Sequence, residues 1–141
     1  MLGLVTRDVI LSIKPRYADQ IVAGVKTIEL RRRFSSEALI GARAFIYSSS
    51  PAMAIIGYAV IANVRRMAVQ EIWEEYADEA AITREEFNFY FRGLTHGYAI
   101  SLRDACRLKT SATISDLRER FDFHAPQSYR YVGAEYSALI G

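Results

Sequence analysis

Residues 10–33, ILSIKPRYADQIVAGVKTIELRRR, hold the densest set of side chains in this sequence that could do chemistry. Lysine and arginine bind phosphate, arginine with two parallel hydrogen bonds, whereas a carboxylate accepts hydrogen bonds from polar ring or sugar groups. Such a set suits a ligand that carries both phosphate and polar ring groups. Its members are Lys14, Lys26, Glu29, Arg31 and Arg33.

A helix and a strand are expected to bring these side chains together. Pro15 suits the first turn of a helix and Gly24 suits a left-handed helix end, which predicts a helix over residues 15–23. Residues 26–33, KTIELRRR, alternate between apolar and polar side chains, the pattern of a half-buried strand. The polar face either converges with Lys14 on a ligand or is simply solvated, with its charges paired to one another. The side chains on this face are Thr27, Glu29, Arg31 and Arg33.

The rest of the chain predicts short strands interrupted by helices. Thr83 followed by Glu86 is a capping box, which predicts a helix beginning at residue 84. This order favours the α+β class, a small mixed β-barrel with peripheral α-helices rather than a layered parallel sheet. No repeat or linker divides the 141 residues, so we expect a single domain over residues 1–141. The predicted strands cover residues 44–47, 55–64, 97–102 and 107–110, and the predicted helices cover 68–78, 84–92 and 115–120.

The composition is that of a folded domain with an uneven charge distribution. Hydrophobic residues make up 51% of the chain and the formal net charge is +2, so neither disorder nor a general polycation is indicated. Residues 1–33 carry seven basic and three acidic side chains, whereas residues 71–86 carry seven acidic and one basic. The longest apolar run, residues 52–62, is too short for a membrane span, and the N-terminus lacks the pattern of a signal peptide. The single cysteine, Cys106, fits a reducing cytoplasm.

The segment GVKTIELR at residues 24–31 resembles the G-x-K-x-x-E-x-R motif of ASCH domains, a branch of the PUA-like superfamily. The resemblance continues in order through ILSIKPRYADQI, IYSSSPAMAIIGYAVI, YF-x-G with GYAISL, and APQSYRYV, so it covers nearly the whole chain. It implies a PUA-like β-barrel with peripheral helices and a cleft lined by the motif. It also implies a link to RNA: binding is the family expectation, and cleavage of single-stranded RNA and hydrolysis of N4-acetylcytidine occur within the group.

The resemblance also implies which residues of this sequence bind the ligand. The motif lysine, acid and arginine fall on Lys26, Glu29 and Arg31. The basic groups would neutralise phosphate, Glu29 and a serine would bond base or ribose, and Tyr47 would stack or donate its hydroxyl. Met53 stands where relatives often carry lysine, so one cationic contact is missing. The expected nucleic-acid-binding residues are Lys14, Lys26, Glu29, Arg31, Arg33, Tyr47, Ser48, Ser128 and Arg130, and Ser49, Gln127 and Tyr129 lie in the same matching segments.

The sequence leaves open whether the chain catalyses a reaction, and Lys26 and Glu29 are the candidates if it does. Relatives that hydrolyse N4-acetylcytidine carry threonine where Glu29 stands, so an amidohydrolase, lacking that hydroxyl, is the weaker enzymatic hypothesis. A ribonuclease would either hold Mg²⁺ through carboxylates or use an acid and a base on the ribose 2′-OH. Spacing indicates no metal site and no other cofactor. Glu71, Glu74 and Glu75 suit a solvated helix face, and His96 and His124 are isolated in sequence.

Three hypotheses result. The leading one is a cytoplasmic RNA-binding ASCH protein whose basic cleft takes single-stranded RNA, a nucleotide or a modified nucleoside. The second is an enzyme that acts on RNA, a ribonuclease before an amidohydrolase. The third is a module for small molecules or proteins that kept the barrel and lost nucleic acid. In each case the helical aromatic residues are expected in the core, namely Trp73, Tyr76, Phe87, Phe89, Tyr90 and Phe91.

Overall fold

The computed structural model describes residues 7–35 and 39–140. Within these residues the strands are β1 (Asp8–Ile13), β2 (Ile28–Arg31), β3 (Arg43–Ser48), β4 (Ala54–Ala68), β5 (His96–Thr113) and β6 (Tyr129–Val132). The α-helices are α1 (Pro15–Val22), α2 (Val69–Ala80), α3 (Arg84–Tyr90) and α4 (Ile114–Phe121), and a 3₁₀ helix, η2, covers Ala134–Leu139. None of the helices in this part of the chain is long and apolar enough to cross a membrane. The expectation that no signal peptide is present concerns the N-terminus, of which residues 1–6 lie outside the described residues.

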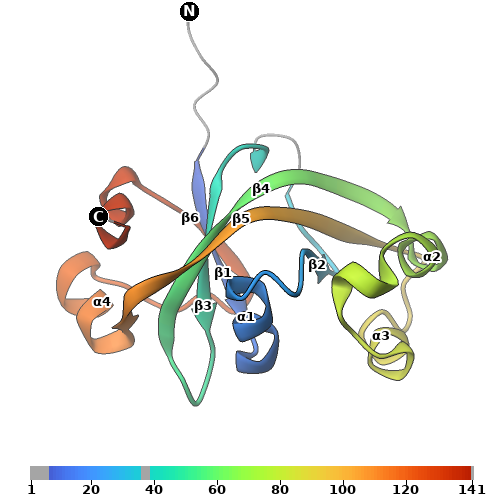
Figure 1. Cartoon of the computed structure of the whole chain (residues 1–141), viewed down its shortest axis with the longest axis horizontal. Coiled ribbons are helices and arrows are strands. Elements are labelled where there is room, and N and C mark those ends of the chain that lie inside the picture. The colour runs from blue at the N-terminus through green and yellow to red at the C-terminus, as the bar shows by residue number, and fades with distance from the viewer. Residues whose placement is uncertain (1–6, 36–38, 141) are drawn as a thin grey trace, which may run out of the picture.

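The described strands form one six-stranded sheet in the order β2-β5-β4-β3-β1-β6. β1 pairs with β3 in parallel, and the other pairs are antiparallel. Figure 1 shows the long strands β4 and β5 running the length of the molecule, with α2 and α3 at one end and α4 at the other. The α+β class is therefore confirmed. Backbone pairing within the described residues ends at β2 on one edge and β6 on the other, so closure into a barrel stays a prediction.

Local sequence signals account for two of the helices. Pro15 begins α1, and Gly24 follows its end with a positive φ of 78°, a conformation that glycine adopts without strain. At the start of α3, the Thr83 hydroxyl accepts a hydrogen bond from the backbone N–H of Glu86 at 3.1 Å. Both helix starts agree with the prediction from sequence.

The long strand β5 differs from the prediction, which placed two separate strands at residues 97–102 and 107–110. One strand runs continuously from His96 to Thr113. Asp104 within it has a positive φ of 53°, and the register between β4 and β5 shifts at several points. Irregular pairing of this kind lets a strand bend and pass through a polar segment without ending.

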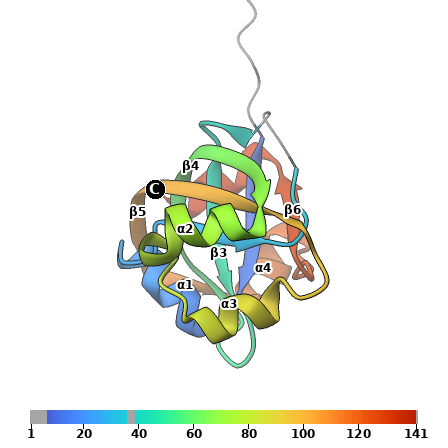
Figure 2. The ribbon, with the colours of Figure 1, turned by 90° about the vertical axis from the view of Figure 1, so that its right-hand side faces the viewer.

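Among residues 7–35 and 39–140, three hydrophobic clusters form the core. The first packs α1 against the sheet and includes Ile46, and the second surrounds Phe45 beneath α4 and η2. The third, which includes Phe87, packs α2 and α3 against β2 and β5. Figure 2 shows these two helices side by side in front of the sheet, with α3 next to α1. Because Ile28 and Leu30 of β2 belong to the third cluster, the alternate side chains of this strand point toward the other side.

The helical aromatic residues divide between core and surface. Phe87 and Phe91 are buried, with 1% and 2% of their surfaces exposed. Trp73, Tyr76 and Tyr90 pack partly buried against the same cluster. Phe89 is 66% exposed, so its prediction as a core residue is wrong. Residues two apart on a helix point in nearly opposite directions, which is why Phe89 faces away from the cluster that holds its two neighbours.

Candidate functional site

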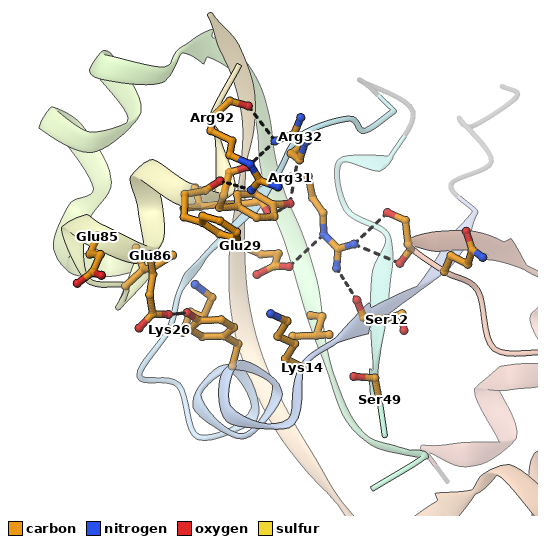
Figure 3. Close-up of a pocket in the computed structure, with 18 residues that line it drawn as sticks. Ser12, Lys14, Lys26, Glu29, Arg31, Arg32, Ser49, Glu85, Glu86 and Arg92 are labelled. Carbon is orange, nitrogen blue, oxygen red and sulfur yellow. Dashed lines mark hydrogen bonds and ion pairs between the residues drawn. The ribbon is translucent and has the colours of Figure 1, made fainter. Parts of the chain in front are cut away.

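A cavity of about 870 Å³ lies between β2, α1, α3 and the segment that leads into β6. Its volume is within the range of pockets that hold small molecules and cofactors. Five basic and three acidic side chains line this pocket, so its wall carries an excess of positive charge. The basic side chains are Lys14, Lys26, Arg31, Arg32 and Arg92, and the acidic ones are Glu29, Glu85 and Glu86 (Figure 3).

The floor of the pocket consists of Lys26, Glu29 and Arg31, which are 3%, 7% and 7% exposed. The hypothesis of a solvated polar face is therefore wrong for Glu29 and Arg31, although these two charges pair with each other as it expected, and Arg33 is exposed. Glu29 and Arg31 face the pocket because the alternate side chains of β2, Ile28 and Leu30, fill the third core cluster, and Lys26 enters the pocket from the segment before this strand. Burying charged groups is costly unless each finds a partner, and the partners are present.

Arg31 connects separate parts of the sheet through nearly all of its donors. Its Nε donates to Glu29 Oε2 at 3.0 Å, and its Nη2 donates to the carbonyl oxygen of Ser12 at 3.0 Å. Its Nη1 donates to both the carbonyl oxygen and the hydroxyl of Ser128, at 3.2 and 3.1 Å (Figure 3). One side chain thus joins β2 to β1 and to the residue that precedes β6.

Lys26 is held at the other side of the floor. Its Nζ donates to the carbonyl oxygen of Ala80 at the end of α2 and lies 4.8 Å from the centroid of the Tyr17 ring. Burial lowers the pKa of Lys26, the negative charge of Glu29 opposes this effect, and the positive charge of Arg31 adds to it. The ammonium form is thus destabilised relative to an exposed lysine.

The lowered pKa of Lys26 predicts a dependence of stability on pH. At pH values below 10.5, the ordinary pKa of lysine, the unfolded chain binds the proton of the Lys26 amine more tightly than the folded chain does. The contribution of Lys26 to the free energy of unfolding therefore increases as the pH rises from the pKa of Lys26 in the folded chain toward 10.5. We expect the stability of Lys26→Met relative to the wild type to decrease from neutral pH to about pH 10, measured by urea unfolding. The exposed Lys109→Met is the control, and a parallel pH trend in both variants would contradict the prediction.

Three side chains tie α1 to α3 at the mouth of the pocket. The Tyr17 hydroxyl donates to the Glu86 carboxylate, and Arg16 forms an ion pair with the same carboxylate. Arg16 Nη2 also donates to the Tyr17 hydroxyl at 2.7 Å. The hydrogen bond from Tyr17 is the largest cause that lowers the pKa of Glu86, followed among the lowering effects by the charge of Arg16. Sequence analysis missed this set because 69 residues separate Tyr17 from Glu86 and no local spacing connects them.

The rim of the pocket is more exposed than its floor. Lys14 is exposed at the junction of β1 and α1. At the opposite end, Arg32 Nη1 donates to the carbonyl oxygen of Tyr90 at 2.6 Å, and Arg92 Nη1 donates to that of Phe89 at 2.8 Å. Figure 3 shows Arg32 and Arg92 close together, away from Glu85 and Glu86. The rim therefore has a basic end and an acidic end.

The predicted site residues divide into two groups. Lys14, Lys26, Glu29, Arg31 and Ser128 line the pocket, together with Ser49 and Gln127. Arg33, Tyr47, Ser48 and Arg130 do not.

Each residue outside the pocket has a structural reason for its position. Arg33 is exposed beyond the end of β2. Tyr47 is 2% exposed and packs in the second core cluster, with its ring 5.5 Å from that of Phe123. Ser48, also 2% exposed, pairs with Ile13 across β1 and β3. The Arg130 guanidinium lies 5.3 Å from the centroid of the same Phe123 ring.

Several residues that line the pocket were not predicted from sequence, among them Arg32, Phe89, Tyr90 and Arg92. Arg32 was not among the polar-face residues expected from the alternation of residues 26–33, because β2 ends at Arg31 and the alternation ends with it. Within residues 7–35 and 39–140, no group of three or more His, Cys, Asp or Glu residues could hold a metal ion.

Comparison with known proteins places this geometry in a family. Residues 6–123 match a family described as a domain of unknown function (DUF365). An ASCH domain-containing ribonuclease from Zymomonas mobilis subsp. mobilis is 32% identical over 130 residues, covering 92% of this chain and 86% of the relative.

Solved structures agree with the sequence comparison. The crystal structure of ASCH from Zymomonas mobilis matches with a TM-score of 0.88 at 30% identity, over 95% of this chain and 93% of that chain. The N-terminal domain of Staphylothermus marinus McrB matches with a TM-score of 0.61 at 12% identity, over 99% and 97% of the two chains, which shows a shared fold alone. With the motif of residues 24–31 in the floor of its pocket, the chain belongs to the ASCH-domain family.

Proposed function

We propose that this protein binds RNA, single-stranded or as a nucleotide-like fragment, in the pocket. The observation that carries the proposal is the gathering of five basic side chains around a nucleotide-sized cavity whose floor is the ASCH motif. The ASCH relative that is named a ribonuclease supports RNA as the ligand. A pocket of this size can receive a base only when that base is unpaired, which favours single strands over duplexes.

The burial of each residue suggests its role in the proposed complex. Lys14 at the exposed rim is free to contact phosphate, whereas Lys26 in the floor contributes its charge at short range. Glu29 and Ser128 face the pocket and offer oxygen atoms to a base or a ribose. Since nearly all donors of Arg31 are already engaged, we infer that it positions Glu29 and Ser128 and adds positive potential.

The remaining predicted residues would act from outside the pocket. Arg33, exposed beyond β2, would extend the basic track for the RNA backbone. Tyr47, Ser48 and Arg130 would support the pocket through the sheet instead of contacting the ligand, because two of them are buried and none lines the cavity.

We further propose that the domain is a single PUA-like unit whose sheet closes into a small barrel. The two edges of the sheet are β2 and β6. Arg31 supports closure, because its side chain extends from β2 and bonds to Ser128, the residue that precedes β6. Closure through side chains would keep the two walls of the pocket at a fixed separation.

Lys14 provides the first test of RNA binding. The affinity of the wild type for a labelled single-stranded RNA should fall as salt rises, because phosphate contacts release counterions. Lys14→Ala should weaken binding at low salt and make the slope of log K against log salt shallower by about 0.7, the value for one contact to a single strand.

The matched control is Lys109→Ala, which removes an exposed lysine of β5 outside the pocket. Absence of wild-type binding at low salt, or binding that ignores salt, would contradict the proposed function. Equal effects of the two lysine variants would place the contact elsewhere on the surface.

A ribonuclease is the second candidate function, favoured by the presence of both Lys26 and Glu29 in the floor of the pocket. In that reaction the Glu29 carboxylate would accept the proton of the attacking ribose 2′-OH, and the Lys26 ammonium, whose pKa burial lowers, would donate a proton to the leaving 5′-oxygen. Hydrolysis of N4-acetylcytidine is less supported, since Thr27 does not line the pocket. Incubation with single-stranded RNA, with and without Mg²⁺, and separately with N4-acetylcytidine tests both activities. Glu29→Gln should abolish whichever reaction is seen, and unchanged substrates would leave the protein as a binder.

A further inference from the structure

Phe89 is the most exposed large hydrophobic side chain in the described part of the protein. It is 66% exposed, compared with 1% for Phe87 and 2% for Phe91. It also lines the pocket, next to charged side chains of α3. The fold does not require an aromatic ring at this position, since the neighbouring phenylalanines already anchor α3 to the third core cluster.

The ring of Phe89 is held in place by Arg92. The guanidinium carbon lies 3.9 Å from the ring centroid, and Nη1 of the same side chain donates to the Phe89 carbonyl oxygen at 2.8 Å. Arg32 donates to the carbonyl oxygens of Tyr90 and Arg92, at 2.6 and 3.3 Å. These contacts satisfy carbonyl groups at the end of α3 and hold Arg32 and Arg92 in place beside this end of the helix.

We propose that Phe89, backed by Arg92, is the platform on which one unpaired base of a bound RNA stacks. This inference rests on the proposed function and names the contact that takes the base. The guanidinium covers one face of the ring, and the high exposure leaves the other face available. Aromatic stacking tolerates every base, because each base has a π-face, and a cation beside the ring strengthens the site for an anionic ligand.

The charge distribution around Phe89 favours nucleic acid over an apolar protein partner. Arg92 lies against the ring, and Arg32 is bonded to the carbonyl oxygens of Tyr90 and Arg92, so both guanidinium groups can reach the phosphates that flank a stacked base. A single exposed ring between charged side chains, with Arg92 on one face and Glu85 and Glu86 one helical turn away, is not the contiguous apolar patch that protein interfaces use.

The test measures the affinity of a short single-stranded RNA for the wild type and four variants of the full chain. Phe89→Ala should raise Kd by about 5- to 150-fold, the range for loss of one stacked base. Phe89→Leu, which keeps an apolar side chain without the ring, should lose nearly as much, whereas Phe89→Tyr should bind like the wild type. Ile40→Ala is the control, because Ile40 is exposed but does not line the pocket. Circular dichroism checks that each variant is folded.

A second measurement detects stacking directly. The fluorescent base 2-aminopurine, placed in turn at each position of the RNA, should be quenched at one or two positions when the wild type or Phe89→Tyr is saturated with RNA. The quenching should be lost in Phe89→Ala at saturating protein concentration.

The outcomes separate this inference from the proposed function. Salt-dependent binding by the wild type, with unchanged affinity and unchanged quenching in Phe89→Ala, would overturn the platform alone. If Phe89→Leu bound the RNA with wild-type affinity, the platform would also be overturned, because an apolar side chain without an aromatic ring would then be sufficient. Absence of any RNA binding by the wild type would overturn both.

Discussion

Replacement of Arg31 by alanine is expected to lower the free energy of unfolding by about 3–5 kcal/mol, the loss typical of a broken buried ion pair. The Arg31 and Glu29 side chains are only 8% and 9% exposed, and their Nε and Oε2 atoms are 3.0 Å apart. Without Arg31, the Glu29 carboxylate would be left buried and unpaired, and the bonds to Ser12 and Ser128 would be lost as well. Urea unfolding followed by circular dichroism measures the change.

Two further variants separate the buried charge from the lost hydrogen bonds. Adding Glu29→Gln to Arg31→Ala should recover part of the stability, because the amide that replaces the carboxylate carries no charge. Arg66→Ala, at an exposed arginine of β4, should leave the stability close to that of the wild type. If Arg31→Ala were as stable as Arg66→Ala, the bridge across the sheet edges would have no energetic role.

Replacement of Phe87 by alanine is expected to have a similar cost, about 3–5 kcal/mol, through loss of burial and the cavity left behind. Its ring is 1% exposed and lies 5.1 Å from Trp73 and 5.0 Å from Phe91, measured between ring centroids. These contacts belong to the cluster that holds α2 and α3 on the sheet, so the variant should also loosen one wall of the pocket. We therefore expect weaker RNA binding at a temperature where the variant is still folded.

Phe45→Ala is the matched control for this second effect. Phe45 is fully buried in the second core cluster, whose residues do not line the pocket. It should lose comparable stability but keep its affinity for RNA. Equal affinity losses in the two variants would mean that general destabilisation, and not the position of α3, governs binding. If Phe87→Ala does not fold, Phe87→Leu gives a milder form of the same comparison.

The sequence predicted those parts of the fold that depend on neighbouring residues. Pro15 and Gly24 delimit α1, and the hydroxyl of Thr83 caps α3, because each signal acts within one turn of a helix. The position of the motif residues in one pocket also agreed with the resemblance to ASCH domains, since Lys26 and Glu29 lie in its floor.

The wrong predictions concern residues whose burial depends on segments that are far away in the sequence. Alternation in residues 26–33 correctly placed Glu29 and Arg31 on one face, but it could not show that α1 and the approach to β6 cover that face. The exposure of Phe89 was not predicted because helical spacing alone does not say which of several aromatic residues meets the sheet. Tyr47 was expected at the cleft, yet it lies in the second core cluster, where Phe123, far along the chain, covers it.

The contrast between a buried floor and an exposed rim bears on how ligand preference can change over evolution. Floor residues such as Arg31 also hold the sheet together, so few substitutions there leave a stable protein. Lys14, Phe89 and Arg92 are exposed, and substitutions at exposed positions usually cost little stability. If the rim contacts the ligand as proposed, its residues can be exchanged one at a time with little loss of stability, whereas exchanges in the floor also weaken the scaffold.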